Sequence, residues 1–252
     1  MSARIDLFGC PVDALTMAES LARIEEIIEH GEPQQHMAVN ANKVVEMDRD
    51  AELREIVRSS AIINADGAAV VFASRFLGTP VPERVTGVDL FVALMELAAA
   101  KGYRPYLLGA RPEVVQAVVD KYSGGENPVD FAGFRDGYFP ESEDEAVARE
   151  IGNARADMLF VAIPTPRKEK FLGRYRDVMG VPFLMGVGGT FDVVVGKVSR
   201  APELFRENGL EWLWRLIQEP KKMWRRNVYG STTFVLRVLR ARYFGYRLPE
   251  EG

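Results

Sequence analysis

The segment NADG, residues 64–67, carries a carboxylate that could take part in chemistry. Asp66 follows an apolar run and precedes a glycine and small residues, which is typical of a strand that runs into a helix. A carboxylate there can act as a general base that removes a proton from an attacking hydroxyl. It can equally cap the following helix by accepting the N–H groups of residues 68 and 69. The local pattern leaves both interpretations open.

A second polar segment, PERVTGVDL at residues 82–90, places an arginine before a predicted helix. Arg84 could bind a phosphate through both arms of its guanidinium, while Thr86 or Asp89 could cap the helix. The alternative is an exposed ion pair between Glu83 and Arg84, which would contribute little free energy. The spacing does not separate the two.

The segment GVGGTFD, residues 186–192, has glycines that would let a backbone approach a diphosphate closely. Gly186, Gly188 and Gly189 are the candidate binding positions, and a tight turn without a ligand is the alternative. The dinucleotide fingerprint G-x-G-x-x-G would need glycine where this chain has Phe191, and the sequence has no Walker-type phosphate loop.

We expect no metal ligands. Asp48 and Asp50 form the only D-x-D pattern, but the surrounding pattern is helical, and positions i and i+2 of a helix do not face each other. His30 and His36 lack the spacing of a metal-binding pair, and the lone cysteine, Cys10, cannot build a zinc site. The sequence therefore predicts neither a metal nor a cofactor.

The C-terminal stretch interleaves aromatic and basic residues. Residues 200–247 hold eleven bases and four acids, a net charge of +7 in a chain of −4 overall, so the rest carries −11. Because Trp and Tyr settle at the lipid headgroup level and bases are attracted to anionic lipid, this composition fits docking on an anionic membrane surface. The alternative is a helix pair whose aromatic residues complete the protein's own core. We expect no nucleic-acid partner, since no standard nucleic-acid-binding motif is present.

The apolar periodicity predicts the scaffold that positions these segments. Short β-branched runs alternate with longer amphipathic patterns, which indicates an α/β fold with a Rossmann-like, largely parallel sheet and flanking helices. The expected strands are residues 36–40, 61–64, 104–108, 128–132, 157–163 and 182–187, and the expected helices are residues 14–29, 42–58, 88–101, 112–122, 142–155 and 166–179.

Ligands of such folds bind beyond the carboxyl ends of the strands. The segments VNANK, NADGAA, LLGARP (with Gly109) and GVGGTFD fall at those ends and form the expected site. Beyond residue 200 only helical patterns remain. We therefore expect a core of residues 1–199 and a helical appendage of residues 200–252.

The composition places the chain in a broad class. With 252 residues, 47% hydrophobic and 27% charged, it is long enough for one main core. The N-terminus lacks the basic start and apolar run of a secretory signal, and a single cysteine fits a reducing compartment. No run approaches the ~20 apolar residues of a transmembrane helix. We expect a cytoplasmic protein that contacts the inner leaflet of the membrane peripherally.

In this order, the segments resemble the WecG/TagA/CpsF family of bacterial glycosyltransferases. The resemblance runs through IDLFGCPVD, VNANKVV, NADGAAVVFASRFLG, PVPERVTGVDL, YLLGA, DGYF, DMLFVAIPTPRKEKF, GVGGTFDVVVGKVSRAP, GLEWLWRLIQEP and the following RR, nearly the whole chain. Its members add N-acetylmannosamine, its uronic acid or related sugars to polyprenyl-diphosphate-linked intermediates of surface polysaccharides. The resemblance implies an inverting, metal-independent transfer from a UDP-sugar to a lipid-linked acceptor. A nucleotide-binding α/β protein without transferase activity is the alternative, and a homo-oligomer is compatible with either.

The resemblance also implies roles for individual residues. Asp66 matches the family's proposed base, and Arg84 matches a residue proposed to act beside it. Asn40 or Asn42 matches a donor-site asparagine, and Asp192 belongs with the GVGG segment to the nucleotide-binding region. Basic appendage positions are implied to fold over the site, and these are Arg215, Lys222 and Arg225, with Arg226 beside them.

Two positions depart from the family pattern. Many members read P-K-Q-E where this chain has residues 166–169, so a neutral amide becomes the ammonium of Lys168. We expect Lys168 to contact the donor and to favour a sugar or phosphate with extra negative charge, such as a uronic acid. The polar residue that often precedes the early asparagine is also absent, with Ala38 and Val39 in its place. Both departures concern the identity of the donor sugar.

Overall fold

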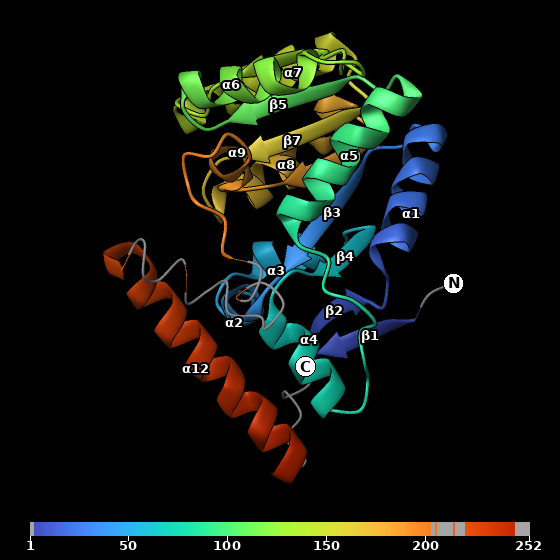
Figure 1. Cartoon of the computed structure of the whole chain (residues 1–252). Coiled ribbons are helices and arrows are strands. Elements are labelled where there is room, and N and C mark those ends of the chain that lie inside the picture. Colours follow the sequence, from blue (N-terminus) through green and yellow to red (C-terminus); the bar gives the residue numbers. More distant parts are fainter. Residues whose placement is uncertain (1–2, 203–204, 206–213, 215–219, 245–252) are drawn as a thin grey trace.

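A six-stranded, wholly parallel sheet forms the centre of the protein (Figure 1). The computed structural model describes residues 3–202, 205, 214 and 220–244, with the side chains of the last helix described from Gly230 onward. The strands are β3 (Gln34–Val39), β4 (Ile62–Ala65), β5 (Pro105–Gly109), β6 (Gly133–Arg135), β7 (Met158–Ala162) and β8 (Phe183–Gly186). They lie in the order β4-β3-β8-β7-β5-β6. The predicted α/β fold is confirmed.

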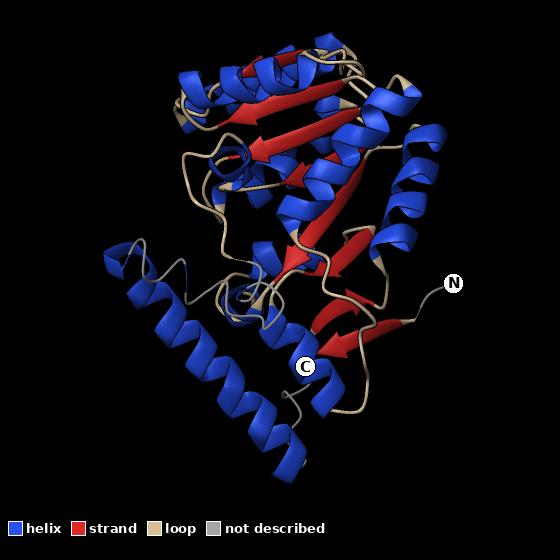
Figure 2. Cartoon of the chain, viewed as in Figure 1, coloured by secondary structure: helices blue, strands red, loops and turns tan. Residues whose placement is uncertain are grey.

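Helices cover both faces of the sheet (Figure 2). One face carries α1 (Met17–His30), α5 (Gly87–Lys101), α6 (Pro112–Ser123) and α9 (Thr190–Val194), and the other carries α3 (Ala51–Arg58), α7 (Asp144–Ala154) with the short η1 (Glu141–Glu143), and α8 (Arg167–Met179). Leu159 and Phe160 of β7 point to opposite faces, and both are wholly buried. Burial on both faces explains why the strands read as continuous apolar runs.

One predicted strand is displaced. Residues 128–132 were expected to form it, but the strand that pairs with β5 is β6, and its register sets Gly133 opposite Tyr106. A Cβ on Gly133 would lie 2.7 Å from the Tyr106 ring. Pairing therefore begins at the residue without a side chain, five positions later than the apolar run suggested.

The long helix predicted over residues 42–58 is broken into two. Helix α2 (Ala41–Glu46) ends before α3 begins, and Asp50 is the N-cap of α3, accepting the Leu53 N–H at 3.0 Å. The D-x-D pattern thus lies in the break between two helices, and its placement inside a helix was wrong. A capping carboxylate within the run marks such a break.

An N-terminal hairpin extends the fold beside β4. Strands β1 (Arg4–Leu7) and β2 (Cys10–Asp13) pair antiparallel and were not among the predicted strands. Asp13 accepts the N–H of Ile63 at 2.8 Å and holds Arg4 at 2.7 Å. The hairpin therefore covers the edge of the sheet at β4.

The last helix, α12 (Pro220–Phe244), packs against α2 and α4 (Ala68–Phe76), as Figure 1 shows. Phe234 is 1% exposed and meets the Phe8 ring edge-on at 6.0 Å, and Val238 is buried beside it. Arg237 pairs with Asp48. The appendage boundary near residue 200 stays a prediction, but this part of the appendage rests on the body. Among the helices of the described ranges, none is long and apolar enough to cross a membrane.

Candidate active site

The loop after β4 is fastened to the end of β3. The backbone N–H groups of Asp66 and Gly67 both donate to the carbonyl of Val39, at 2.9 and 3.2 Å. A Cβ on Gly67 would lie 3.0 Å from the Cβ of Asn40, which leaves little room for a side chain. Two adjacent parallel strands thus bring the NADG and VNANK segments into contact, as their places at strand ends predicted.

The carboxylate of Asp66 lies at the start of α5. Its Oδ1 accepts the backbone N–H of Gly87 at 3.0 Å, and Asp66 is half-buried. The N-cap of its own helix, α4, is Gly67, with no side-chain cap. The interpretation that Asp66 caps the following helix is therefore wrong: it contacts a helix N-terminus 21 residues further on. One oxygen is oriented by Gly87, and no hydrogen bond occupies Oδ2 within the described residues.

The PERVTGVDL segment forms the start of α5. Thr86 is the N-cap and accepts the N–H of Asp89, and its hydroxyl donates back to the Asp89 carboxylate at 2.6 Å. Burial alone would raise the pKa of Asp89, but hydrogen bonds from Thr86 and Arg200 and the charges of Arg200 and Arg84 bring it below its ordinary value. Arg84 therefore lies in the electrostatic neighbourhood of the helix N-terminus that holds Asp66. Glu83 accepts the N–H of Met17.

A buried polar chain holds the strand before Asp66. His36 of β3 and Asn64 of β4 share a hydrogen bond of 2.9 Å, and Asn64 donates to Ser20 of α1 at 3.0 Å. Burial lowers the pKa of His36 to about 4, so this imidazole is neutral. These hydrogen bonds hold β4 in place at Asn64, two residues before Asp66.

The two asparagines of VNANK differ in their surroundings. Asn40 is the N-cap of α2 and accepts the Lys43 N–H at 3.1 Å, which leaves its amide N–H₂ as the group able to meet a ligand. Asn42 faces α12, where a Cβ on Gly230 would overlap its side-chain oxygen. Any other residue at position 230 would require the Asn42 side chain to move. Asn40 therefore lies with Asp66, while Asn42 lies at the contact with the appendage.

Glycines line the ends of β5 and β8. Gly109 has a φ of +125°, and a Cβ there would overlap the backbone of Ala162 in β7, so only glycine fits. Gly188 is also left-handed, and Gly189 is exposed beside α9, which carries the half-buried Asp192. The two loops flank β7 on either side, as the strand order requires.

Lys168 belongs to a buried cluster that the sequence did not reveal. It lies in the first turn of α8, and its Nζ is 2.7 Å from Oε1 of Glu169 and also donates to Thr165. Lys43 of α2 reaches the same oxygen at 3.0 Å. Burial alone would raise the pKa of Glu169, but the two ammonium groups hold it at about 2. The available signal in the sequence was Lys43, the one charged residue of the segment VNANKVV.

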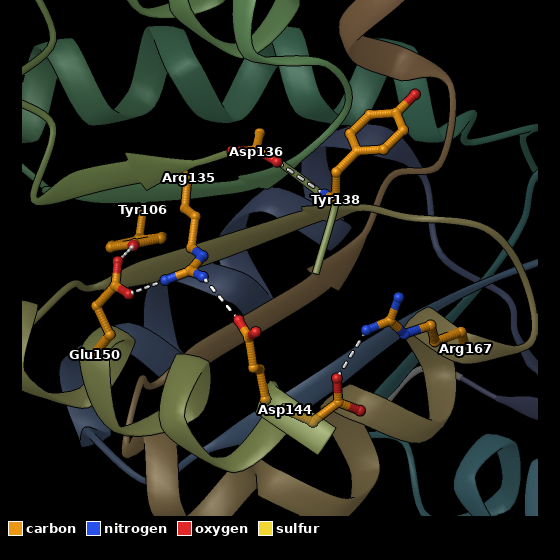
Figure 3. Close-up of polar contacts among 8 residues, drawn as sticks. Tyr106, Arg135, Asp136, Tyr138, Asp144, Glu150 and Arg167 are labelled. Atoms are coloured by element: carbon orange, nitrogen blue, oxygen red, sulfur yellow. Dashed lines mark hydrogen bonds and ion pairs between the residues drawn. The ribbon is translucent and has the colours of Figure 1, made fainter. Parts of the chain in front are cut away.

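A second network fastens the DGYF segment at the far end of the sheet (Figure 3). Arg135 of β6 pairs with Glu150 at 2.5 Å, and Glu150 also accepts the Tyr106 hydroxyl at 2.8 Å. Arg167, the first residue of α8, pairs with Asp144 at 2.9 Å and lies over the Phe139 ring at 4.6 Å.

The side chain of Tyr138, in the same DGYF segment, takes no part in these ion pairs. The N–H of Gly137 donates to Ala110, and a Cβ on Gly137 would meet Gly109 and Ile163, so the loop rests on the ends of β5 and β7. Asp136 accepts the N–H of Tyr138 at 2.9 Å. Figure 3 shows Tyr138 directed away from the ion pairs, and it is 73% exposed.

The two aspartates of the D-x-D pattern, Asp48 and Asp50, form ion pairs with basic side chains. Asp50 binds Lys170 at 2.8 Å besides capping α3, and Asp48 binds Arg237. No group of three His, Cys, Asp or Glu side chains with metal-binding geometry occurs in the described part of the chain. The absence of a metal in the reaction stays a prediction.

The basic appendage candidates lie outside the described residues or side chains. Arg215 falls outside the described ranges, and only the backbone is described for Lys222, Arg225 and Arg226 of α12. Their role over the site stays a prediction.

Fold and site together define an α/β protein whose polar candidates gather at the carboxyl ends of parallel strands. Residues 5–248 match the model of the Glycosyl transferase WecG/TagA/CpsF family, and the chain belongs to this family of glycosyltransferases. It is 37% identical over 192 residues to the N-acetylglucosaminyldiphosphoundecaprenol N-acetyl-beta-D-mannosaminyltransferase of Bacillus subtilis (strain 168). The matched region covers 76% of this chain and 73% of that protein. The resemblance of the segments is thereby confirmed.

Proposed function

We propose that this glycosyltransferase moves a hexose from a UDP-sugar onto a polyprenyl-diphosphate-linked saccharide in surface-polysaccharide synthesis, with inversion and without a metal. The acceptor class is supported by the name of the Bacillus subtilis relative, which acts on an undecaprenyl-diphosphate-linked sugar. The sugar that is transferred is N-acetylmannosamine, its uronic acid or a related hexose.

The single observation that carries the mechanism is the placement of Asp66. Its Oδ1 is held by the Gly87 N–H, and Oδ2 is available to take the proton of an attacking hydroxyl. A carboxylate oriented by a second group is the arrangement that base catalysis needs. Asn40 lies against Gly67, and Arg84 precedes the start of α5 that holds Asp66, so both would bind the donor there.

The strand order supports one orientation of the donor. Neighbouring strands are ~4.8 Å apart, so the end of β8 lies ~10 Å from the end of β4 and ~10 to 15 Å from the ends of β5 and β6. We place the sugar near Asp66, the diphosphate at Gly186 to Gly189, and the uridine toward Gly109 and Tyr138. Backbone N–H groups and arginines would then meet the charge of departing UDP without a metal ion.

An exposed apolar stripe supports docking on a membrane. Leu236, Leu239 and Tyr243 repeat along one side of α12, and Tyr243 meets Phe76 of α4 at 6.3 Å, next to the exposed Phe72. The exposed bases at this surface are Arg75, Arg240 and Arg242. Each would gain ~1 kcal/mol at an anionic leaflet, and the aromatic rings would enter the headgroup layer. We therefore infer that the protein works on the inner leaflet, where its acceptor is anchored.

Product analysis tests the proposed function. The enzyme would be incubated with a panel of UDP-sugars and a polyprenyl-diphosphate-linked N-acetylglucosamine, and products identified by mass spectrometry, with the anomeric configuration read by NMR. We expect one hexose to be added with inverted configuration. Hydrolysis of the donor without transfer, or a retained configuration, would contradict the proposal.

A further inference from the structure

Arg200 joins the segment that follows α9 to the first turn of α5. Its guanidinium pairs with the carboxylate of Asp89, 111 positions earlier in the chain, and donates to Oδ1 of that group. The other oxygen, Oδ2, accepts the hydroxyl of Thr86 at 2.6 Å. Asp89 is therefore held by Thr86 from its own helix and by Arg200 from a distant segment.

The turn that contains Asp89 also orients the candidate base. Thr86 is the N-cap of α5, and the next residue, Gly87, donates its backbone N–H to Oδ1 of Asp66 at 3.0 Å. Gly87 and Asp89 lie two positions apart within one helical turn, so a shift of Asp89 would also move the N–H that orients Asp66. Arg200 is thereby connected to Asp66 through the first turn of α5.

The segment that carries Arg200 is fixed to the glycine-rich loop after β8. The N–H of Val198 donates to the carbonyl of Asp192 in α9 at 3.1 Å, and Ala201 is buried. Helix α9 begins directly after Gly189, in the region where we place the diphosphate. Arg200 thus connects the loop that would hold the leaving group to the turn that orients the base.

Stability alone does not account for this ion pair. The cap of α5 is complete without Arg200, because Thr86 and Asp89 already exchange hydrogen bonds within it. Helices α5 and α9 are also joined by the buried rings of Phe91 and Phe191, whose centroids lie 5.6 Å apart. The side chains of Arg200 and Asp89 are 34% and 39% exposed, and ion pairs with such exposure contribute little free energy. What the pair adds is a fixed distance between two loops of the site.

We propose that Arg200 is a positioning residue for the transfer reaction, which acts through Asp89 and the first turn of α5 to hold Asp66 at a fixed distance from the donor diphosphate. The inference rests on the proposed function, because it takes Asp66 as the base. Misplacement of a reacting group by about 1 Å can cost about 10²-fold in rate, even when the change lies away from the chemistry. The expected signature is a loss of kcat with little change in the binding of UDP.

Removing either partner of the ion pair tests the inference. In Arg200→Gln and in Asp89→Asn we expect kcat to fall about ten-fold or more, while the Kd for UDP stays within about two-fold of the wild type. The double variant should lose no more than either single variant, because both changes break one interaction. Arg200→Lys keeps the charge and should recover part of kcat. Steady-state kinetics and calorimetry with UDP measure these effects.

The Asp66→Asn background separates positioning of the base from other roles. If Arg200 acts through Asp66, adding Arg200→Gln should change the residual rate of Asp66→Asn by less than about two-fold. The matched control is Lys197→Gln, three residues earlier, which removes the exposed ion pair between the same segment and Glu113 of α6. It should keep the wild-type kcat and show a melting temperature close to that of Arg200→Gln.

Several outcomes would overturn the inference. One is a wild-type kcat in Arg200→Gln. Another is a parallel loss of UDP binding, or a loss of rate that persists in Asp66→Asn, since either would give Arg200 a role that does not pass through the base. A much lower melting temperature in Arg200→Gln than in Lys197→Gln would make the ion pair a support of the fold. A wild-type enzyme that transfers no hexose would instead overturn the proposed function itself.

Discussion

Asp66 accepts the backbone N–H of Gly87 at 3.0 Å, which places the candidate base at the N-terminus of a helix that begins 21 residues later. This hydrogen bond fixes the direction of the Asp66 carboxylate. Arg84 and the Thr86 cap belong to the same turn. One loop thus orients the candidate base and also carries Arg84, three residues before Gly87.

Replacing Asp66 by Asn tests this assignment. The amide oxygen can still accept the Gly87 N–H, so we expect the loop to keep its shape and UDP binding to persist. Turnover should fall by ~10² to 10⁴-fold, because an amide cannot take the proton of the acceptor. Steady-state kinetics and calorimetry with UDP check both parts. Asp120→Asn on the exposed face of α6 is the control, and wild-type kcat in Asp66→Asn would refute the base assignment.

Chelation tests the metal-free mechanism. Because Asp48 and Asp50 are engaged by Arg237, Lys170 and the Leu53 N–H, we expect excess EDTA to leave the transfer rate unchanged. Rates would be compared before and after chelation and after added Mg²⁺ or Mn²⁺. Loss of activity that either cation restores would mean that a metal takes part.

Tyr138 tests the orientation of the donor. Its exposed ring is held at the ends of β5 and β7, where we place the uridine, and stacking on a base contributes ~1 to 3 kcal/mol. Tyr138→Ala should weaken UDP binding by about ten-fold, whereas Tyr138→Phe should bind as the wild type does. If alanine binds UDP normally, the uridine lies elsewhere.

Two kinds of variant on α12 separate its core face from its membrane face. Phe234→Ala should lower the free energy of unfolding by ~3 to 5 kcal/mol, because a wholly buried ring is removed. Replacing Arg240 and Arg242 by Gln and Leu239 by Ser should leave stability nearly unchanged but reduce sedimentation with anionic liposomes. Salt should weaken wild-type binding, since ~1 M salt shortens the Debye length to ~3 Å. Equal liposome binding by wild type and the triple variant would exclude this face as the docking surface.

The buried His36 predicts a dependence of stability on pH. Its pKa is lowered to about 4 in the folded protein, so the unfolded chain binds the extra proton between pH 6.5 and 4. The contribution of neutral His36 to the free energy of unfolding is fully present above pH 6.5 and falls as the pH drops through this window. The loss is about 2 kcal/mol between pH 7 and 5. Urea unfolding at the two pH values measures it, and His36→Gln should remove most of the difference. A wild type equally stable at both values would contradict the burial of a neutral imidazole.

Ionisation of Glu169 affects the stability of the protein in a lower pH range than His36 does. Its pKa of about 2 lies below the usual 4.5, so its contribution to stability is present above pH 4.5 and is lost as the pH falls toward 2.

The layers of the fold and the strand ends that carry the candidate site could be predicted from the amino-acid sequence alone. Local apolar runs predict β3, β4, β5, β7 and β8, because parallel strands buried on both faces need continuous apolar segments. The order of NADG, PERV and GVGG was enough to identify the family. The break at Asp50 and the shifted β6 were missed, because a cap and a close contact with the Tyr106 ring outweigh apolar periodicity.

Which side chains meet depends on long-range packing and could not be predicted from the local sequence. Nothing in the local pattern of NADG indicates that Asp66 contacts Gly87 rather than its own helix, since the partner comes from another segment of the chain. The pairing of Lys43 with Glu169, 126 positions apart, depends on β3 and β7 flanking β8. Strand order is set by the packing of helices on both faces, and that long-range packing is what turns separate polar segments into one charged site.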